Sequence, residues 1–299
     1  MSARVTVAVP ILLLLSLALP ACPKPPPVGP ALPPPPGQPL ERPFFWRVDP
    51  RADTTAEPTY ILGTRHIGID PFEVLPLGIW RKFDGATSLV MEVDLTGPET
   101  LGLGKLPEGQ TLDTQMSAED WARIVQALDL DRDEADAIKR LQPWMLVIQL
   151  TQTLTPSART IEDVLHQRGK EQKKREVFLE TISVQAGLLS RFIDIAYLLE
   201  FVSDLDKQKR ALAQQARVYR SGDEKALYQS AIVNMEKHIG KDGMDALMYG
   251  RNRAWLPALE RLVAEGDTFV MVGAAHLVGP GSVLDLLRQR GYTVTRLPE

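Results

Sequence analysis

The sequence predicts an α/β protein whose mixed, mainly parallel sheet is built from two related strand-helix units, separated by a large helical insertion. An apolar run followed by Gly-x-x-His and another glycine occurs at residues 60–68, and the same layout returns at residues 269–279. Short apolar runs bounded by glycine are typical of buried strands. A helical pattern and a further strand pattern follow each copy, which favours parallel pairing. We therefore expect His66 and His276 to meet at one edge of the sheet.

The two units account for most of the expected strands. Residues 44–48 predict a first strand that pairs with residues 59–62 across a turn too long for a tight hairpin. In the first unit we expect a helix within residues 72–83 and a strand at residues 88–93. In the second unit the corresponding helix and strand are expected at residues 282–290 and 292–297.

The middle of the chain, about residues 115–250, predicts a helical insertion that lies as a layer over the sheet. It begins after a Gly- and Pro-rich stretch that we interpret as a loop (96–110), and Ser117 starts a capping-box pattern. A short strand is expected at residues 176–180, ending in Glu180. Helices are expected at residues 132–140, 143–153, 161–168, 183–201, 205–220, 224–238 and 244–265, the last of them kinked or restarted at Pro257.

The N-terminal region carries signals of export. Arg4 and the apolar run that follows it predict a signal peptide over residues 1–21. The apolar run has some fifteen residues, too few to span a membrane. Cys22, the only cysteine, follows Leu-x-Ala as in bacterial lipoproteins, so we expect lipidation there and a lipid anchor in the cell envelope, facing the periplasm or the cell exterior. The alternative is a simple secreted or tethered protein with an incidental cysteine. Residues 22–43 are rich in proline and predict a stiff spacer, so the folded domain is expected at 44–299.

The charge and the motif content exclude several classes of function. The formal net charge is −4, with no basic cluster beyond residues 173–175, so nucleic acid is not an expected partner. The patterns of a phosphate-binding loop, a Gly-x-Ser-x-Gly hydrolase and a His-Glu-x-x-His metalloprotease are absent. What remains is chemistry at the two histidine turns.

His66, His276, Glu92 and Glu180 are the candidate site residues. A single histidine of this kind is usually a hydrogen-bonded core residue, but two in equivalent strand-end contexts favour a functional site. Glu92 stands in an otherwise apolar strand, so it is either paired with an arginine such as Arg251 or bound to a cation. Two imidazoles and two carboxylates suit Mn²⁺, Co²⁺, Fe²⁺ or Zn²⁺. Such an ion would activate water, with a carboxylate as base and Arg251 stabilising the oxyanion.

The ordered set of these residues resembles the TraB/GumN (also PrgY and Tiki) family. It comprises Gly63-Thr64-Arg65-His66, Met91-Glu92-Val93-Asp94, Leu179-Glu180-Thr181 with Gln185, Arg251-Asn252, and Gly273-Ala274-Ala275-His276. The resemblance implies a fold related to erythromycin-esterase-like and ChaN-like proteins. It also implies a metal-dependent hydrolase or peptidase using a divalent ion, Mn²⁺ or Co²⁺ above all, with Zn²⁺ and Fe²⁺ also compatible.

By that likeness His66, His276 and Glu92 are the metal ligands, and Glu92, Glu180, Arg251 and Asn252 are catalytic. The sequence departs from the family at Arg65, where the residue is usually uncharged, and this alters the charge expected at the site entrance. A peptide or a small molecule is the expected substrate. The alternatives are a non-catalytic lipoprotein that binds or sequesters peptides, and a structural envelope protein.

Overall fold

The protein is described from a computed structural model. The structure describes residue 32 and residues 37–51, 55–94, 100–155 and 159–298. The predicted signal peptide, Cys22 and most of the proline-rich segment lie outside the described residues, so the expectations placed on them stay predictions. The division into an anchor, a spacer and a folded domain is likewise a prediction.

The described residues form one six-stranded sheet in the order β4-β3-β5-β2-β1-β6. The first four strands, β4 (Arg175–Phe178), β3 (Ser88–Met91), β5 (Thr268–Gly273) and β2 (Thr59–Thr64), run parallel. β1 (Phe45–Asp49) is antiparallel to both of its neighbours, β2 and β6 (Thr293–Arg296). The predicted fold class, a mixed and mainly parallel α/β sheet, is confirmed.

The two histidine turns are neighbours because β2 and β5 pair directly. Their register places Thr64 opposite Gly273, so both strands end at the same level. A Cβ atom at Gly63 would approach Ala274 to 3.0 Å, which shows how closely the end of β2 packs against the second turn. Residues far apart in the sequence are therefore held side by side by a ladder of backbone hydrogen bonds.

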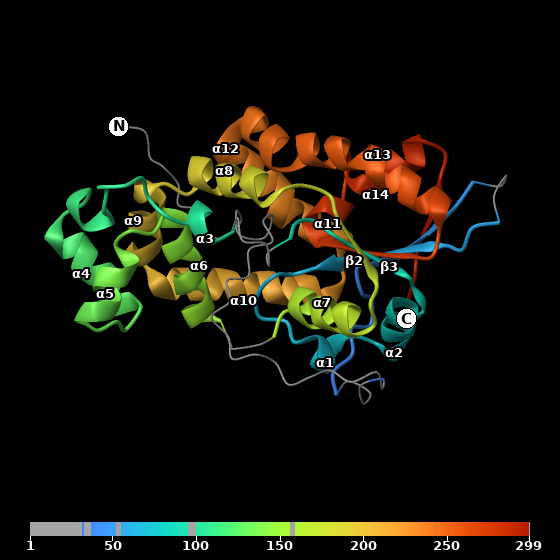
Figure 1. Ribbon diagram of the computed structural model, residues 1–299, viewed down its shortest axis with the longest axis horizontal. Helices are drawn as coiled ribbons and strands as arrows, with labels where there is room; N and C mark the ends of the chain where they lie inside the picture. Colours follow the sequence, from blue (N-terminus) through green and yellow to red (C-terminus); the bar gives the residue numbers. More distant parts are fainter. Residues whose placement is uncertain (1–31, 33–36, 52–54, 95–99, 156–158, 299) are drawn as a thin grey trace.

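Helices cover both faces of the sheet. In Figure 1, α13 (Gly250–Glu265) and α14 (Val283–Gln289) lie on one face, and α1 (Pro71–Val74), α2 (Leu77–Gly85) and α7 (Ile161–Glu171) lie on the other. The prediction of a single helix within residues 72–83 was wrong. Two short helices are found instead, because Pro76 has an extended backbone and no N–H to continue the first turn.

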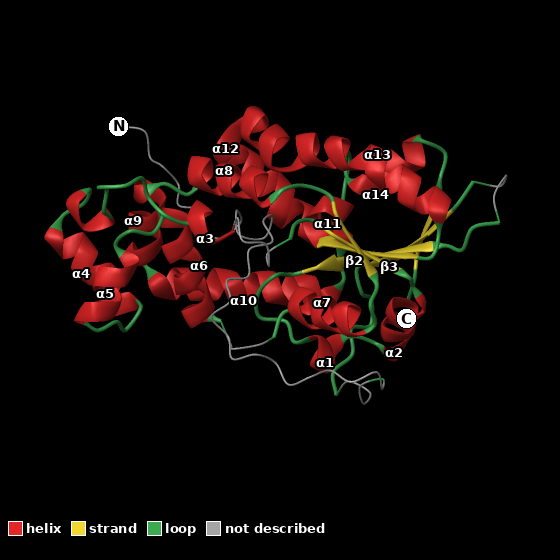
Figure 2. Ribbon diagram, in the orientation of Figure 1, coloured by secondary structure: helices red, strands yellow, loops and turns green. Residues whose placement is uncertain are grey.

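The helical insertion is only partly a layer over the sheet. Figure 2 shows that α4 (Ala118–Ala127) and α5 (Arg132–Ile138) stand with α9 (Ile195–Ser203) in a lobe well away from the strands. The helix α10 (Leu205–Ser221) runs from the lobe to the sheet. The expected loop at 96–110 contains a helical turn, α3 (Thr100–Leu103), and its residues 96–99 are outside the described residues. The remaining elements are η2 (Leu112–Thr114), α6 (Pro143–Leu154), α8 (Ile182–Phe192), α11 (Glu224–Tyr228), η3 (Gln229–Val233), α12 (Asn234–Met244), η4 (Asp245–Tyr249) and η5 (Ala274–Leu277).

Three of the long predicted helices differ in detail. The helix expected at 183–201 is broken into α8 and α9, which meet at 66°. The pattern at 224–238 includes the π-helical segment η3, and the one at 244–265 begins with another, η4. The helix does not restart at Pro257, because α13 runs without a break from Gly250 to Glu265 with this exposed residue inside it.

No single helix in the described part of the chain is long and apolar enough to cross a membrane, although α8 and α9 together would be by length and composition.

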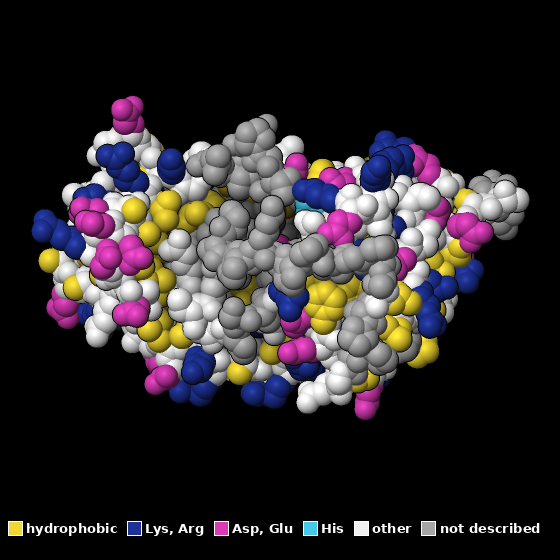
Figure 3. Space-filling model, turned by 60° about the horizontal axis from the view of Figure 1, so that its bottom comes forward, with side chains coloured by type: hydrophobic (Ala, Val, Ile, Leu, Met, Phe, Trp, Pro, Cys, Tyr) yellow, Lys and Arg dark blue, Asp and Glu magenta, His cyan; other side chains and the backbone are white. Residues whose placement is uncertain are grey.

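The core lies between the sheet and its two helical layers. Large side chains fill it without exposure, including Phe45, Phe83 and Phe269, and the Phe269 ring contacts the other two. Acidic and basic side chains are interspersed over the face drawn in Figure 3. The sheet is thus held rigidly between apolar layers, and the polar groups at its carboxyl edge start from fixed backbone positions.

Candidate active site

Four adjacent strands each deliver one predicted site residue to the same edge of the sheet. Glu180 lies two residues after β4, Glu92 directly follows β3, His276 lies in η5 after β5, and His66 lies two residues after β2. Glu92 was expected inside its strand, but β3 ends at Met91. The carboxyl ends of parallel strands are where ligand sites gather in open sheets. The structure therefore brings the four residues together, as the sequence predicted.

Arg251 is the hub of this cluster. It projects from the start of α13 and is 4% exposed. Its Nε donates to Glu180, its Nη2 donates to Glu92 Oε2 at 2.8 Å and to Glu180 Oε1 at 2.7 Å, and its Nη1 donates to the Leu247 carbonyl at 3.1 Å. Nη1 also lies 3.1 Å from His276 Nε2. A guanidinium has five N–H donors, and these contacts use all of them.

The pKa of Arg251 follows from these partners. Burial lowers it, but the attraction of Glu92 and Glu180 outweighs that penalty, and the pKa is raised above its ordinary value. The ion pair of Glu92 with Arg251, one of the two alternatives that the sequence left open, is therefore found. The expected oxyanion role of Arg251 does not fit this arrangement, because the guanidinium has no spare donor.

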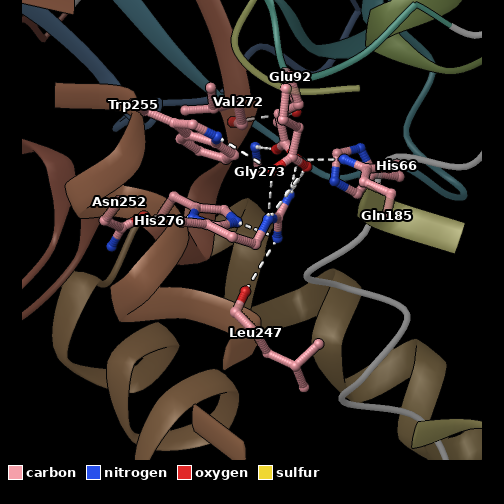
Figure 4. Close-up of polar contacts among 12 residues, drawn as sticks. His66, Glu92, Gln185, Leu247, Asn252, Trp255, Val272, Gly273 and His276 are labelled. Carbon is pink, nitrogen blue, oxygen red and sulfur yellow. Dashed lines mark hydrogen bonds and ion pairs between the residues drawn. The ribbon is translucent and has the colours of Figure 1, made fainter. Parts of the chain in front are cut away.

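Glu92 is held from three directions. Its Oε1 accepts from the Gly273 backbone N–H at 2.7 Å, and its Oε2 accepts from Arg251 and from Gln185 Nε2 at 3.1 Å. In Figure 4 the Glu92 carboxylate lies between His66 on one side and the pair of Gly273 and His276 on the other. Glu92 thus ties the ends of β3 and β5 to α8 and α13.

His276 is fully buried and is fixed in one tautomer. Its Nδ1 lies 2.6 Å from Asn252 Oδ1, and Asn252 Nδ2 donates to the Gly281 carbonyl at 2.9 Å, which fixes the orientation of the amide. Since Oδ1 can only accept, Nδ1 carries the hydrogen, and Nε2 accepts from Arg251. The Trp255 ring packs against the imidazole at 4.5 Å between centroids. This ring is a neutral acceptor facing a cation.

His66 has a carboxylate partner instead. Its Nδ1 lies 2.5 Å from Glu162 Oε1, and the ring is 5% exposed. Burial opposes protonation, but the charge and hydrogen bond of Glu162 outweigh it and raise the pKa of His66. The pKa of Glu162 is lowered by the same contact, against its own burial. The pair therefore favours an imidazolium beside a carboxylate.

Two members of the cluster were not predicted from the sequence. Glu162 lies in the first turn of α7, where acidic residues are common for helix-dipole reasons, so its sequence context gives no sign of a partner 96 residues away. Trp255 donates from Nε1 to Glu180 Oε2 at 3.2 Å. Trp255 lies four residues after Arg251, which places both on one face of α13, so this spacing could have identified Trp255 as a neighbour of the site.

The other two histidines are separate from the site. Both were expected at the surface, and His238 is exposed on α12. His166 is half-buried on α7, where its Nε2 lies 2.8 Å from Glu176 Oε1. Burial and the nearby Lys170 lower the pKa of His166 despite that carboxylate. The surface prediction was wrong for His166, because α7 packs its ring toward β4.

The cluster as arranged does not fit a divalent ion, although one feature resembles a metal site. Both site histidines anchor Nδ1 on an outer partner, as metal-ligating histidines do. However, His276 Nε2 and the Glu92 and Glu180 carboxylates all accept from Arg251. An ion at this position would meet the guanidinium charge. No group of three or more His, Cys, Asp or Glu side chains in the described ranges is arranged to hold a metal. The described arrangement is that of an arginine-centred ion network.

The chain is similar in sequence to several known proteins. It is 27% identical over 237 residues to the uncharacterized protein YbaP of Escherichia coli (strain K12), a match that covers 77% of this chain and 87% of that protein. An uncharacterized protein of Treponema pallidum (strain Nichols) is 26% identical over 261 residues, 77% of each chain. The metalloprotease TIKI homolog of Amphimedon queenslandica is 22% identical over 320 residues, 85% of this chain and 61% of that protein.

No solved structure gives a significant match. The model of the TraB/PrgY/gumN family matches residues 44–296, which is most of the chain and includes both histidine turns, Glu92, Glu180 and Arg251. The chain therefore belongs to the TraB/PrgY/gumN family.

Proposed function

We propose that this protein is a hydrolase that cleaves peptide bonds, with its active site at the carboxyl ends of β2, β3, β4 and β5. The observation that carries the proposal is the His66–Glu162 pair, a buried imidazole oriented by a carboxylate beside a fixed polar cluster. An oriented imidazole is the usual form of a general base. The relatives named as metalloproteases support a peptidase at low identity.

In the proposed reaction His66 transfers the proton. Nδ1 is engaged by Glu162, so Nε2 takes a proton from a water molecule while the water oxygen bonds to the scissile carbonyl carbon. The same proton passes to the leaving nitrogen as the carbon–nitrogen bond breaks, which yields a carboxylic acid and an amine. Glu162 stabilises the imidazolium between these two events. Arg251 holds Glu92, Glu180 and His276 in position throughout.

The sequence predicted a divalent ion at this site, Mn²⁺ or Co²⁺. The described residues do not fit an ion while Arg251 bonds both carboxylates. When bound, such an ion would supply Lewis-acid activation of water or of the carbonyl. Metal analysis of the purified protein beside His276→Ala tests the point, because a genuine site loses stoichiometric metal in the variant.

The activity is tested by incubating the purified protein with a mixture of unlabelled peptides and identifying the products by mass spectrometry. Parallel samples contain a chelator, or added Mn²⁺, Co²⁺ or Zn²⁺. We expect His66→Gln to lower kcat/KM by about 100- to 10,000-fold, the usual contribution of a general base. His238→Gln is the control, since this exposed histidine lies on α12, outside the cluster. Equal rates for His66→Gln and the wild type would overturn the assignment of the base.

One observation favours the non-catalytic alternative. Every N–H of Arg251 is used within the protein, as in a network that only stabilises structure. A peptide-sequestering protein would bind peptides without cleaving them, and His66→Gln would leave that affinity unchanged. Calorimetric titration of the same peptides into wild type and His66→Gln separates the two functions.

We also propose that the protein is tethered to a membrane of the cell envelope through a lipid on Cys22. The apolar segment before Cys22 and the proline-rich spacer after it support this. Cys22→Ser is expected to move the protein from the membrane fraction to the soluble fraction and to abolish labelling by radioactive palmitate. A variant that remains membrane-bound and labelled would contradict the anchor.

A further inference from the structure

A small, partly open pocket lies between the two histidine turns, lined by backbone and side chains from both. Thr64 and Arg65 come from the first turn, and Ala274 and Ala275 come from the second. Gln215 and Tyr219 of α10 are part of its wall. Arg65 precedes His66 and Ala275 precedes His276, so the pocket is one residue along the chain from each site histidine.

Arg65 is the charged group of this pocket. It is 2% exposed, and its Nη1 and Nη2 donate to the backbone carbonyls of Ile67 and Leu212, the latter at 3.1 Å. Its Nε is buried and has no hydrogen-bond partner among the described residues. Both acceptors are neutral, so these bonds orient the guanidinium without balancing its charge.

Comparison with Arg251 shows how unusual this is within the same molecule. Both arginines are buried, but Arg251 is paired with two carboxylates, and its pKa is raised. For Arg65, burial lowers the pKa to about 10; the hydroxyl of Tyr219 acts in the opposite direction and the nearby Arg220 adds to the lowering. A buried cation without a carboxylate costs several kcal/mol, and an anion that entered the pocket would recover part of that cost.

The amide of Gln215 is a second polar group at the pocket without a complete set of partners. Its Oε1 is buried and has no donor within the described ranges. A rotation of the amide by half a turn would turn its NH₂ donors to where Oε1 now lies, and these can bond an anion. Two groups on different elements would then gain partners from the same ligand.

We propose that this pocket binds a carboxylate of the substrate, with Arg65 as its cation, so that the enzyme selects peptides carrying a carboxylate close to the bond that is cleaved. The carboxylate is either the chain terminus of the peptide or an Asp or Glu side chain. This inference rests on the proposed peptidase function for its meaning, but it is tested by binding. Arg65 is a specificity-determining residue, and it takes no part in proton transfer.

The test compares three probes by calorimetry in the cold, with their integrity checked afterwards by chromatography. They are Ala-Ala-Ala with a free carboxyl terminus, the same peptide as its amide, and Ala-Glu-Ala as its amide. The wild type is expected to bind at least one carboxylate-bearing probe about tenfold or more tightly than Ala-Ala-Ala amide, as one buried charge-assisted hydrogen bond would give. A preference for the free acid identifies the terminus as the ligand, and a preference for the glutamyl probe identifies the side chain.

Arg65→Met is expected to lose this discrimination, Arg65→Lys to keep part of it, and Arg123→Met, a change at an exposed arginine of α4, to keep all of it. Equal binding of the three probes by the wild type overturns the inference without any variant, so a failure of Arg65→Met to fold does not protect it. Discrimination that persists in Arg65→Met overturns it as well. A protein that discriminates but cleaves nothing supports this inference and overturns the peptidase. A protein that cleaves peptides but binds the three probes equally does the reverse.

Discussion

The two histidine turns share one sequence layout and one position in the sheet, yet they give their imidazoles opposite surroundings. His66 meets the carboxylate of Glu162, which favours the charged ring. His276 meets the amide of Asn252 and the guanidinium of Arg251, which require a neutral ring with hydrogen on Nδ1. The difference comes from α7 and α13, helices outside both repeats. A repeated motif thus fixes where a side chain lies, and the elements packed against it fix what chemistry that side chain can perform.

The two histidines also differ in whether their ring proton can be exchanged. A base must exchange a proton during turnover, and the His66–Glu162 pair stabilises the protonated form without excluding the neutral one. His276 cannot readily take up a second proton, because the lone pair of its Nε2 already accepts a hydrogen bond from Arg251. The first turn is therefore suited to proton transfer, and the second is suited to holding the network in place.

Removing the cation from the second turn should have the largest effect. Arg251→Met leaves Glu92 and Glu180 buried without their counter-ion, and removal of one partner from a buried ion network costs about 3–5 kcal/mol. Urea denaturation followed by circular dichroism measures the free energy of unfolding. Arg123→Met is the matched control, because the side chain of Arg123 is 46% exposed and its ion pairs lie at the surface. Its loss should change the free energy of unfolding by less than about 0.5 kcal/mol. Similar losses for the two variants would contradict the role of Arg251 as the hub.

The glycines that close the two turns should differ next. Both have positive φ, +70° at Gly68 and +78° at Gly279, so alanine is strained at either position. At Gly279 a Cβ atom would also overlap the Tyr228 ring, whereas at Gly68 it would meet the tip of the Arg65 side chain at 3.1 Å. We expect Gly279→Ala to lose about 2–4 kcal/mol and Gly68→Ala about 1–2 kcal/mol. Thermal unfolding of the pair measures this, and the reverse order would show that the second turn has room to adjust.

These contrasts mark the limit of what the sequence predicted. The strands of both repeats, their parallel pairing and the meeting of His66 with His276 at one sheet edge followed from apolar runs ended by glycine, a local signal. Glu162 could not be predicted, because the pairing partner of His66 depends on how α7 lies against β2. The break between α8 and α9 was missed for a related reason: the apolar residues continue through the bend, and only the side-chain cap of Asp194 marks the new helix start.

For Glu92 the sequence predicted two alternatives and could not choose between them. A carboxylate in an apolar strand required either a cation or an arginine, and that alternative is a property of the sequence. The choice between them is a property of the tertiary structure, because Arg251 lies 159 residues away and reaches Glu92 only when the start of α13 packs over the ends of β3 and β5. Sequence spacing carries no information about that contact.

The third prediction alters the first turn. Glu162→Gln keeps a hydrogen-bond acceptor for His66 but removes the charge that raises its pKa, so the pKa of His66 should fall. Because the base must be neutral, the rise of kcat/KM with increasing pH should occur at lower pH in the variant than in the wild type. A pH–rate profile measures the shift. An identical rise in both proteins would contradict the assignment of His66 as the base.

The same change has a stability consequence whose sign is fixed by the pKa directions. The folded pKa of His66 is raised, so its contribution to stability is fully present below the unfolded pKa and is lost as pH rises through the folded pKa. The folded pKa of Glu162 is lowered, so its contribution is lost only as pH falls through that lowered value. Glu162→Gln should therefore be less stable by about 1–2 kcal/mol in mildly acidic solution, with a smaller difference at alkaline pH.

The smallest effect is expected at the anchor of the second histidine. Asn252→Ala removes the acceptor of His276 Nδ1–H and the donor to the Gly281 carbonyl, while Arg251 still bonds His276 Nε2. Loss of these neutral hydrogen bonds should cost about 1 kcal/mol, less than any change above. Nitrogen NMR of the imidazole reports the tautomer directly. Because Arg251 still donates to His276 Nε2, the ring should remain neutral with its hydrogen on Nδ1. A protonated His276 in the variant would show that Asn252, and not Arg251, sets the protonation state of the ring.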